Sequence, residues 1–280
     1  MVTPEVDLIV NGDVIEGPVP AEFVKHLATE LAQSMESALP GMPIGAPGMP
    51  REKPEVFDRQ GAGWEFLLMG VEMNLYERWI LPRLLDLVMR NKEVTRYRSR
   101  VVPHARGIVL EVGIGSGLNM RFYGPQVEQL FAVDPSEELL RMARRRAHAM
   151  PLPVEFFARS GEVIPLGNQS VDTVLTTFTL CTIPDPLAAL REARRVLKSG
   201  GQLLFAEHGL APDTSVRRWQ HRCNPLWSKI AGGCNLNRKM DQLIRAAGFE
   251  ITELETEYAK GPRPMSYVYS GRAQPIASAS

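Results

Sequence analysis

The chain has 280 residues, of which 44% are hydrophobic and 23% charged, a composition typical of a globular protein with a buried core. Its 32 Lys and Arg balance 32 Asp and Glu, and no run is basic enough to indicate a nucleic-acid-binding protein. The three cysteines lack Cys-x-x-Cys spacing, which argues against disulfides and a metal site and favours a reducing, cytoplasmic location. No stretch reaches the ~18 apolar residues of a membrane-spanning helix, and the acidic N-terminus is unlike a signal peptide.

The first 60 residues differ in charge from the rest of the chain. They hold 4 Lys and Arg against 10 Asp and Glu, which leaves a net positive charge on residues 61–280. Asn11-Gly12 lies between two short apolar runs, a pattern that predicts a β-hairpin. Apolar residues at helical spacing predict an amphipathic helix over 21–39, and the prolines and glycines of 40–50 predict a linker.

The sequence therefore predicts an N-terminal extension, residues 1–60, and a main domain, residues 61–280. The extension has three open interpretations: a lid over a substrate site, a dimerisation arm or a disordered appendage. Its Met and Phe content argues mildly against complete disorder.

Strands and helices are predicted to alternate along the main domain. A helix is expected from Tyr76 to Arg90, starting late or kinked because Pro82 lies near its middle. Strands are then predicted at 108–112, 129–133, 154–157, 171–176 and 202–207, helices near 117–121, 136–149, 186–197 and 236–247, and two tail strands at 249–257 and 265–272. This order predicts an α/β fold with a parallel sheet covered on both faces and one antiparallel edge strand.

The most informative segment is residues 108–117. A short apolar run contains Glu111 and leads into glycines at 113, 115 and 117, and a second apolar run ends at Asp134. A strand, a tight glycine turn and a second strand that ends in a carboxylate are how α/β folds bind adenosine-containing cofactors.

The glycine spacing separates two cofactor classes. The dinucleotide fingerprint G-x-G-x-x-G needs a third small residue at position 118, where this chain has leucine. The segment instead fits E-x-G-x-G-x-G and resembles the first motif of class I S-adenosylmethionine (SAM) dependent methyltransferases. SAM carries a cationic amino group and a sulfonium, which suits Glu111, and Asp134 would accept hydrogen bonds from the ribose hydroxyls.

The resemblance spans roughly residues 75–272 and implies the seven-stranded, mostly parallel, Rossmann-like methyltransferase sheet. Ser170–Val174 and Arg195–Phe205 are similar to later segments of this family. Many members have Asp-Ala-Glu after the third strand, where this chain has Ser160-Gly161-Glu162, so the adenine contact would come from Gly161 or Glu162. The cofactor residues implied are Glu111, Gly113, Gly115, Gly117, Asp134, Pro135, Ser160, Gly161, Glu162, Thr177 and Phe178.

A narrower resemblance involves Leu180-Cys181, Glu207-His208 and the segment from Gly232 to Leu236. These are similar to methyltransferase type 11-like proteins, bacterial relatives of the animal methyltransferase-like enzymes that methylate alkyl thiols. Those animal enzymes have a membrane-anchoring N-terminus, whereas this chain has the acidic extension.

The acceptor side is expected at the carboxyl edge of the sheet, just past the fifth strand. His208 is the candidate base or substrate-orienting residue, with a structural role as the alternative. Candidate substrate-lining residues are Cys181, Trp219, His221 and Asn235, with a core position as the alternative for the aromatic residues. Cys181 and Cys234 are expected to be small pocket-wall or core residues, since methyl transfer needs no enzyme nucleophile.

The function predicted is transfer of a methyl group from SAM to a small acceptor such as a thiol. Two alternatives stay open: a lipid amine or quinol as acceptor, which would favour peripheral membrane contact through the basic body, and a non-catalytic SAM-binding regulatory partner. A homodimer through the N-terminal extension is a further expectation.

Overall fold

The computed structural model describes residues 7–10, 13–16 and 81–276, which fall in two separate units, Met1–Gly61 and Ala62–Ser280. In the first unit, strands β1 (Asp7–Val10) and β2 (Asp13–Glu16) pair antiparallel, which confirms the hairpin predicted around Asn11-Gly12. The predicted helix over 21–39 and the linker over 40–50 lie outside the described residues.

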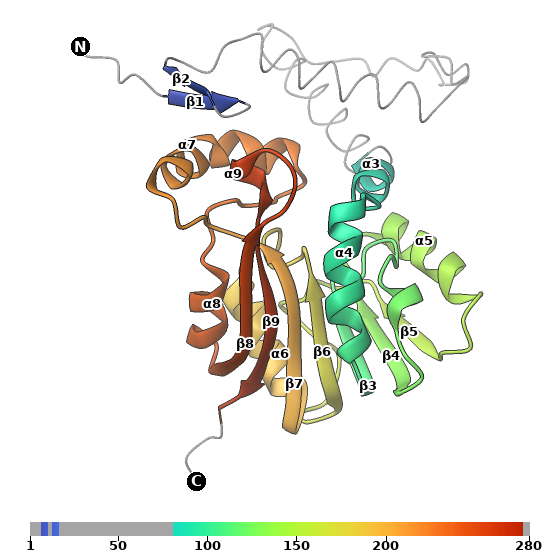
Figure 1. The fold of residues 1–280 in the computed structure, drawn as a ribbon. Coiled ribbons are helices and arrows are strands. Elements are labelled where there is room, and N and C mark those ends of the chain that lie inside the picture. Colours follow the sequence, from blue (N-terminus) through green and yellow to red (C-terminus); the bar gives the residue numbers. More distant parts are fainter. Residues whose placement is uncertain (1–6, 11–12, 17–80, 277–280) are drawn as a thin grey trace, which may run out of the picture. The chain divides into compact units, whose positions relative to one another are not determined.

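A seven-stranded sheet forms the centre of the second unit (Figure 1). Its spatial order is β5-β4-β3-β6-β7-β9-β8, and every adjacent pair is parallel except those that include β9. The strands are β3 (Gly107–Val112), β4 (Val127–Val133), β5 (Val154–Phe157), β6 (Val171–Thr177), β7 (Leu197–His208), β8 (Phe249–Tyr258) and β9 (Tyr267–Pro275). The sheet is the one predicted, and its antiparallel strand lies between β7 and the edge strand β8.

Helices cover both faces of this sheet. The helices are α3 (Leu81–Val88), α4 (Lys92–Val101), α5 (Glu137–Ala147), α6 (Pro186–Val196), α7 (Thr214–Ile230), α8 (Met240–Ala246) and the single turn α9 (Arg263–Ser266). One buried cluster joins α6 and α8 to the sheet, and a second cluster joins α4 and α5 to the opposite face. The result is a three-layer arrangement, with α7 and α9 above the carboxyl ends of the parallel strands (Figure 1).

Side chains just before the helices explain where several of them begin. Asp185 accepts hydrogen bonds from the amides of Leu187 and Ala188, both at 3.0 Å, and Pro186 occupies the first helical position of α6. Ser136 caps α5 and Asn91 caps α4 in the same way. These caps satisfy amides that have no partner within the helix, so they fix the point at which each helix begins.

Two regions differ from the sequence-based expectation. The helix predicted near 117–121 is wrong: this stretch forms turns and a short 3₁₀ helix at Met120–Phe122. Gly117 has a φ of +83°, which a right-handed helix cannot contain. Helices α4 and α7 were not predicted, because α4 has a strongly polar sequence and Pro225 interrupts α7.

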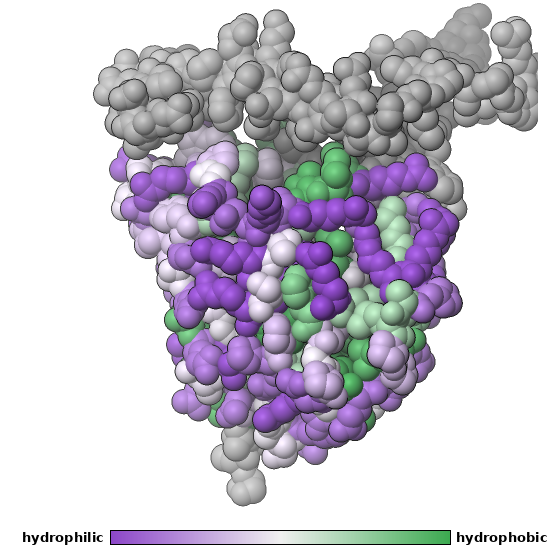
Figure 2. All heavy atoms as spheres, turned by 45° about the vertical axis from the view of Figure 1, so that its right-hand side comes forward, coloured by the Kyte–Doolittle hydropathy of each residue, from purple (hydrophilic) through white to green (hydrophobic). Residues whose placement is uncertain are grey.

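The surface of the described part of the second unit carries both hydrophilic and hydrophobic residues. Figure 2 shows hydrophilic residues over most of the side on which α4 and α5 lie, with scattered hydrophobic ones between them. Leu87 and Val88 of α3 are among the exposed large hydrophobic residues. Within the described part of the chain, none of the helices has both the length and the apolar character required to cross a bilayer.

Candidate active site

The glycine-rich turn after β3 lies beside the end of β4. Gly113, Gly115 and Gly117 all have positive φ, at +72°, +54° and +83°. The carboxylate of Asp134 accepts hydrogen bonds from the amide of Gly115 at 2.8 Å and from the amide of Ser136 at 2.9 Å. Burial raises the pKa of Asp134, and these two amides act in the opposite direction. The turn and the acidic residue are therefore held together.

Glu111 lies in β3 below this turn, and its side chain is buried. It accepts hydrogen bonds from Asn119 Nδ2 at 2.7 Å and from the hydroxyl of Tyr123 at 2.6 Å. Burial raises its pKa to about 7, against the influence of these donors and of Arg98. Close to neutral pH, a nearby positive charge would favour the ionised form of this carboxyl.

Two buried polar atoms near Glu111 have no hydrogen-bond partner among the described residues: Arg98 Nε and Asn119 Oδ1. Arg98 also donates to the carbonyl oxygen of Met89 at 2.6 Å, and its guanidinium lies 6.0 Å from the ring centroid of Phe178. Buried polar atoms normally have partners. A ligand that carries both an anionic and a cationic group would supply them, and the amino-acid end of SAM has that character.

The segment after β5 contains the residues expected near adenine. Ser160 Oγ lies 2.7 Å from Glu162 Oε2, and Glu162 Oε1 accepts the amide of Asp185 at 2.7 Å. Glu162 thus fixes the segment that leads into α6. A Cβ at Gly161 would lie 2.5 Å from Val112 Cγ1, so this segment passes close to the end of β3.

The turn after β6 joins the cofactor side to the end of β7. Thr177 Oγ1 accepts a hydrogen bond from Asn119 at 2.8 Å, and Phe178 adopts a φ of +55°. The hydroxyl of Thr179 donates to the carbonyl oxygen of Gly113 at 3.3 Å, while its amide donates to both carboxylate oxygens of Glu207 at 3.1 and 2.8 Å. The glycine turn and the β6 turn are therefore in direct contact.

Glu207 is a completely buried carboxyl at the end of β7. Burial raises its pKa to about 7, although the amides of Thr179, Leu180 and Cys181 favour the ionised form. Its neighbour His208 is half-buried, and the His208 ring packs edge-on against Phe178 with centroids 4.9 Å apart. His208 thus lies next to the turn that borders the cofactor side.

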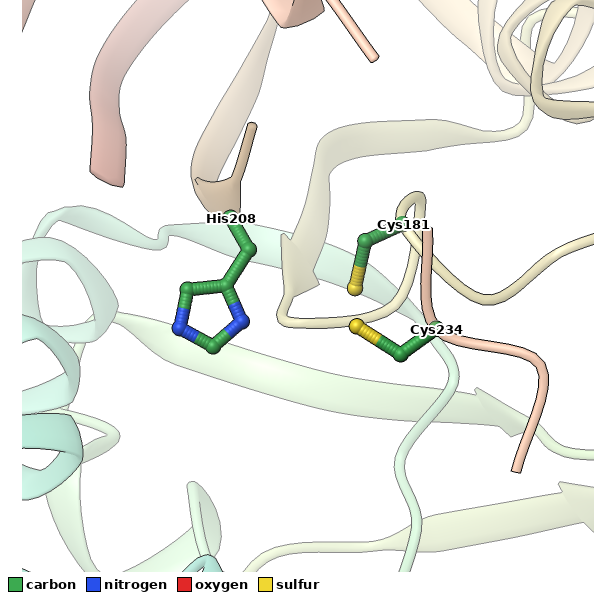
Figure 3. A group of neighbouring side chains, drawn as sticks. All are labelled: Cys181, His208 and Cys234. Atoms are coloured by element: carbon green, nitrogen blue, oxygen red, sulfur yellow. The ribbon is translucent and has the colours of Figure 1, made fainter. Parts of the chain in front are cut away.

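Cys181, His208 and Cys234 form a group (hereafter the Cys–His cluster) at this edge of the sheet. Their sulfur and ring nitrogen atoms all lie within 4.8 Å of one another, and Figure 3 shows the two thiols facing each other beside the imidazole. A hydrogen bond between the thiols, together with His208, lowers the pKa of Cys234, and the same hydrogen bond and burial raise that of Cys181. The three residues come from three separate segments.

The remaining predicted acceptor residues divide into two groups. The side chain of Asn235 donates to the carbonyl oxygen of Cys181 at 3.2 Å, and its backbone amide donates to the same oxygen at 2.8 Å. Asn235 therefore supports the turn that carries Cys181. Trp219 and His221 lie on α7, where His221 is exposed and its Nδ1 lies 3.4 Å from Asn237 Nδ2. Neither belongs to the Cys–His cluster.

The structure adds residues that the sequence interpretation missed. Asn119 and Tyr123 donate hydrogen bonds to Glu111. Arg98, whose charge favours the ionised form of Glu111, lies on helix α4, which was not predicted. Asn119 and Tyr123 lie beyond the end of β3, so their distance from Glu111 along the chain does not indicate a contact, and only the turns that follow β3 bring them back to it.

A methyltransferase domain family matches residues 110–205, which run from β3 to β7. The thiol S-methyltransferase TMT1B of Rattus norvegicus is 31% identical over 204 residues, which cover 71% of this chain and 76% of that protein. The chain belongs to the class I SAM-dependent methyltransferases. The thiol S-methyltransferase TMT1A of Homo sapiens is also 31% identical, over 60% of this methyltransferase and 72% of that protein.

Solved structures agree with this fold. The N-methyltransferase NodS from Bradyrhizobium japonicum, in complex with S-adenosyl-L-homocysteine, matches with a TM-score of 0.54 and 15% identity, over 74% of this methyltransferase and 98% of that chain. A protein family of unknown function, DUF411, matches residues 7–49 of the N-terminal unit. The methyltransferase fold thus accounts for the second unit.

Proposed function

We propose that this methyltransferase transfers a methyl group from SAM to an alkyl thiol. The observation that carries the proposal is the similarity to thiol S-methyltransferases, which extends over 71% of the chain. The position of the His208 imidazole, next to the turn that borders the cofactor side, also supports the proposal. A thiol acceptor needs only modest activation, because its ordinary pKa is about 8.5. SAM supplies an electrophilic methyl group on a positively charged sulfur.

On the cofactor side, we assign three residues to different parts of SAM: Glu111, Asp134 and Arg98. Glu111 balances the amino group of the methionine moiety. The Nε of Arg98, which has no partner among the described residues, suits the carboxylate of that moiety. Asp134 lies at the end of β4, where ligands bind in such sheets, and accepts the ribose hydroxyls. Pro135, Ser160, Gly161, Glu162, Thr177 and Phe178 are the other residues that we assign to the cofactor side.

On the acceptor side, His208 is the residue that we assign to activation of the thiol. Its ring lies against Phe178 and beside two cysteines, at the carboxyl end of β7. Cys181, Trp219, His221 and Asn235 remain the residues proposed to surround the acceptor, with Asn235 acting through the Cys181 turn.

The direct test is the formation of S-adenosylhomocysteine from SAM by the purified full-length protein. An alkyl thiol and the alcohol and amine with the same carbon skeleton serve as matched acceptors. We expect product with the thiol and at least tenfold less with the other two. Turnover of a lipid amine or quinol, or of no acceptor at all, would contradict the proposal.

Asp134→Ala is expected to weaken binding of S-adenosylhomocysteine by several-fold to about a hundredfold, because charge-assisted hydrogen bonds to the ribose are lost. Isothermal titration calorimetry measures the affinity. Glu128→Ala is the control, since Glu128 lies exposed on the same strand and should leave the affinity unchanged. Equal affinities in the two variants would remove the ribose role from Asp134.

Affinity for S-adenosylhomocysteine is expected to rise with pH. Burial raises the pKa of Glu111 to about 7, so this carboxyl is mostly protonated at pH 6 and mostly ionised at pH 8. The cationic amino group of the ligand binds the ionised form better, so affinity should increase by up to about tenfold over this range. Calorimetry at pH 6, 7 and 8 should show this slope in the wild type and a flat profile in Glu111→Gln. Parallel profiles would contradict the assignment.

His208→Ala is expected to lower turnover of the thiol by about tenfold to a hundredfold, as is typical when an activating group is removed. Binding of S-adenosylhomocysteine should stay within about twofold of the wild type, because His208 lies on the acceptor side of Phe178. Steady-state kinetics and calorimetry on the same preparation separate the two effects. Equal losses in both would mean that the histidine is structural.

A further inference from the structure

The Cys–His cluster has the composition of a metal site. Two thiols and one imidazole converge, with all donor atoms within 4.8 Å of one another. No fourth His, Cys, Asp or Glu joins them among the residues that the structure describes. Figure 3 shows the two sulfur atoms next to each other and the imidazole of His208 beside them. Sulfur and imidazole donors in this number favour Zn²⁺.

The dimensions of the cluster fit zinc. Bonds of about 2.3 Å to sulfur and 2.0–2.1 Å to nitrogen in a tetrahedron place neighbouring donor atoms about 3.4–3.8 Å apart. In the structure the donor atoms lie at most 4.8 Å apart, which is about 1 Å more than in such a zinc-bound tetrahedron.

The backbone around the cluster is held in place by hydrogen bonds. The carbonyl oxygen of Cys181 accepts from both the backbone and the side chain of Asn235. Arg238 donates to the carbonyl oxygens of Leu180 and, at 2.7 Å, of Ile183. The Glu207 carboxylate holds the amide of Thr179 at the start of the same turn. Metal sites need such support around their ligands.

We propose that Cys181, His208 and Cys234 bind a zinc ion whose fourth coordination position takes the acceptor thiolate. Three protein ligands with one open position are typical of catalytic zinc, whereas structural zinc has four. Cys181 is buried, but His208 and Cys234 keep partial exposure. This inference rests on the proposed thiol methyltransferase function and assigns how the thiol is activated.

The resulting reaction balances without any other reactant. Zinc deprotonates a coordinated thiol, and the proton passes to water because the lone pair of His208 is used for the metal. The acceptor sulfur forms a bond to the methyl carbon as the bond from that carbon to the sulfonium breaks, and the electron pair goes to the departing sulfur. The product is a neutral thioether, a poorer zinc ligand than a thiolate, so it leaves the site.

Zinc binding by the full-length protein tests the site directly. The protein is stripped with a chelator, kept reduced with a phosphine instead of a dithiol that would compete for zinc, and titrated with Zn²⁺. We expect one zinc per wild-type chain by elemental analysis, and thiolate-to-metal absorption in the near ultraviolet when Co²⁺ replaces it. No retained metal at micromolar Zn²⁺, or cobalt without this absorption, would overturn the proposal.

The chain offers a matched control. Cys223 lies on α7 and is not part of the cluster, so Cys223→Ser should bind zinc as the wild type does. Cys181→Ser and Cys234→Ser should each bind zinc at least about a hundredfold more weakly, since even residues that only support a ligand contribute up to that factor. Circular dichroism checks that the variants fold. Equal zinc affinities in Cys234→Ser and Cys223→Ser would overturn the proposal even if one cluster variant is lost to misfolding.

Turnover separates this inference from the proposed function. Calorimetry with S-adenosylhomocysteine first confirms that the stripped wild-type protein keeps its cofactor site. Thiol methylation that falls at least tenfold on stripping and returns with Zn²⁺ supports the activating role. Methylation that is equally fast with and without zinc would overturn the role of the metal and leave the thiol function standing. Zinc binding without methylation of any thiol would instead reject the proposed function.

Discussion

Gly113→Ala is expected to lower the free energy of unfolding by about 2–5 kcal/mol and to abolish cofactor binding. The backbone at Gly113 has a φ of +72°, and a residue with a Cβ is strained there by about 1–2 kcal/mol. The new Cβ would also lie 2.1 Å from Thr179 Cγ2 and 2.3 Å from Thr179 Oγ1. Overpacking of this kind costs about 1–3 kcal/mol more.

The clash would move Thr179, and Thr179 connects the two halves of the site. Its hydroxyl donates to the carbonyl oxygen of Gly113, and its amide donates to Glu207. Denaturant unfolding measures the loss of stability, and calorimetry with S-adenosylhomocysteine measures binding. Thiol turnover should be lost as well, because the turn that carries Cys181 shifts with Thr179.

Gly115→Ala is the matched control for this prediction. Gly115 also has a positive φ, +54°, but no heavy atom lies within 4 Å of the position that its Cβ would take. The variant should therefore lose only the strain component, about 1–2 kcal/mol. Its Cβ points into the open space that we assign to the cofactor, so its binding should fall as well. Equal losses of stability in the two variants would show that the clash with Thr179 contributes nothing to the loss of unfolding free energy.

The core strands of the sheet could be predicted because they are short apolar runs bounded by turn residues. The run that contains Glu111 and the run that ends at Asp134 are buried parallel neighbours, β3 and β4, so their ends lie at the same edge. Register follows from burial, since only one alignment brings the apolar runs together. The cofactor class could be predicted as well, because a leucine at position 118 excludes the dinucleotide fingerprint.

The missed helices show where such reasoning fails. In α4, the residues that face inward are Val94, Tyr97, Arg98 and Val101, a helical spacing in which a buried arginine interrupts the apolar pattern. Arg98 is 5% exposed and lies near Glu111, so its burial depends on a partner outside the helix, on strand β3. Local periodicity cannot reveal a charge that is stabilised by tertiary contacts.

The Cys–His cluster was missed for a related reason. Spacing rules for metal sites recognise pairs of ligands on one turn, as in Cys-x-x-Cys. Here each ligand follows a different secondary-structure element: Cys181 follows β6, His208 ends β7, and Cys234 follows α7. Parallel strands bring such distant segments together at one edge, and only the topology shows which ones meet.

Glu207→Ala is expected to lower the free energy of unfolding by about 3–5 kcal/mol and to abolish thiol turnover. The buried amide of Thr179 would lose its acceptor, which costs about 1–3 kcal/mol, and the cavity left by the side chain costs a further ~2 kcal/mol. The turn that carries Cys181 would lose its anchor, so zinc affinity should fall too. Glu207→Gln keeps an acceptor oxygen and the volume, so we expect a loss of only about 1–2 kcal/mol. Equal losses in the two variants would contradict the anchoring role.

The pH dependence of stability distinguishes the charge of Glu207 from its volume. Its pKa is about 7 in the folded state, against 4.5 for an ordinary glutamate. The folded state therefore binds the proton more tightly than the unfolded state does. The stabilisation that results is complete below pH 4.5 and is lost as the pH rises through 7. Between these values, such a carboxyl changes the folding equilibrium constant by up to about tenfold per pH unit.

Glu111 behaves in the same way, since burial raises its pKa to about 7 as well. The free energy of unfolding of the wild type should thus fall from pH 5 to 7 with contributions from both carboxyls. Glu207→Gln should lose the share of the slope that is due to Glu207, and the double variant with Glu111→Gln should keep only the share from Asp134, whose pKa burial also raises. Ion pairs lower the pKa of other carboxyls, such as Asp86 and Asp172, in the folded protein. Between pH 5 and 7 these carboxyls are ionised in both the folded and the unfolded state, so they add nothing to the slope. Urea unfolding at pH 5, 6 and 7 measures the slopes, and an unchanged slope in Glu207→Gln would mean that this carboxyl stays ionised in the folded protein.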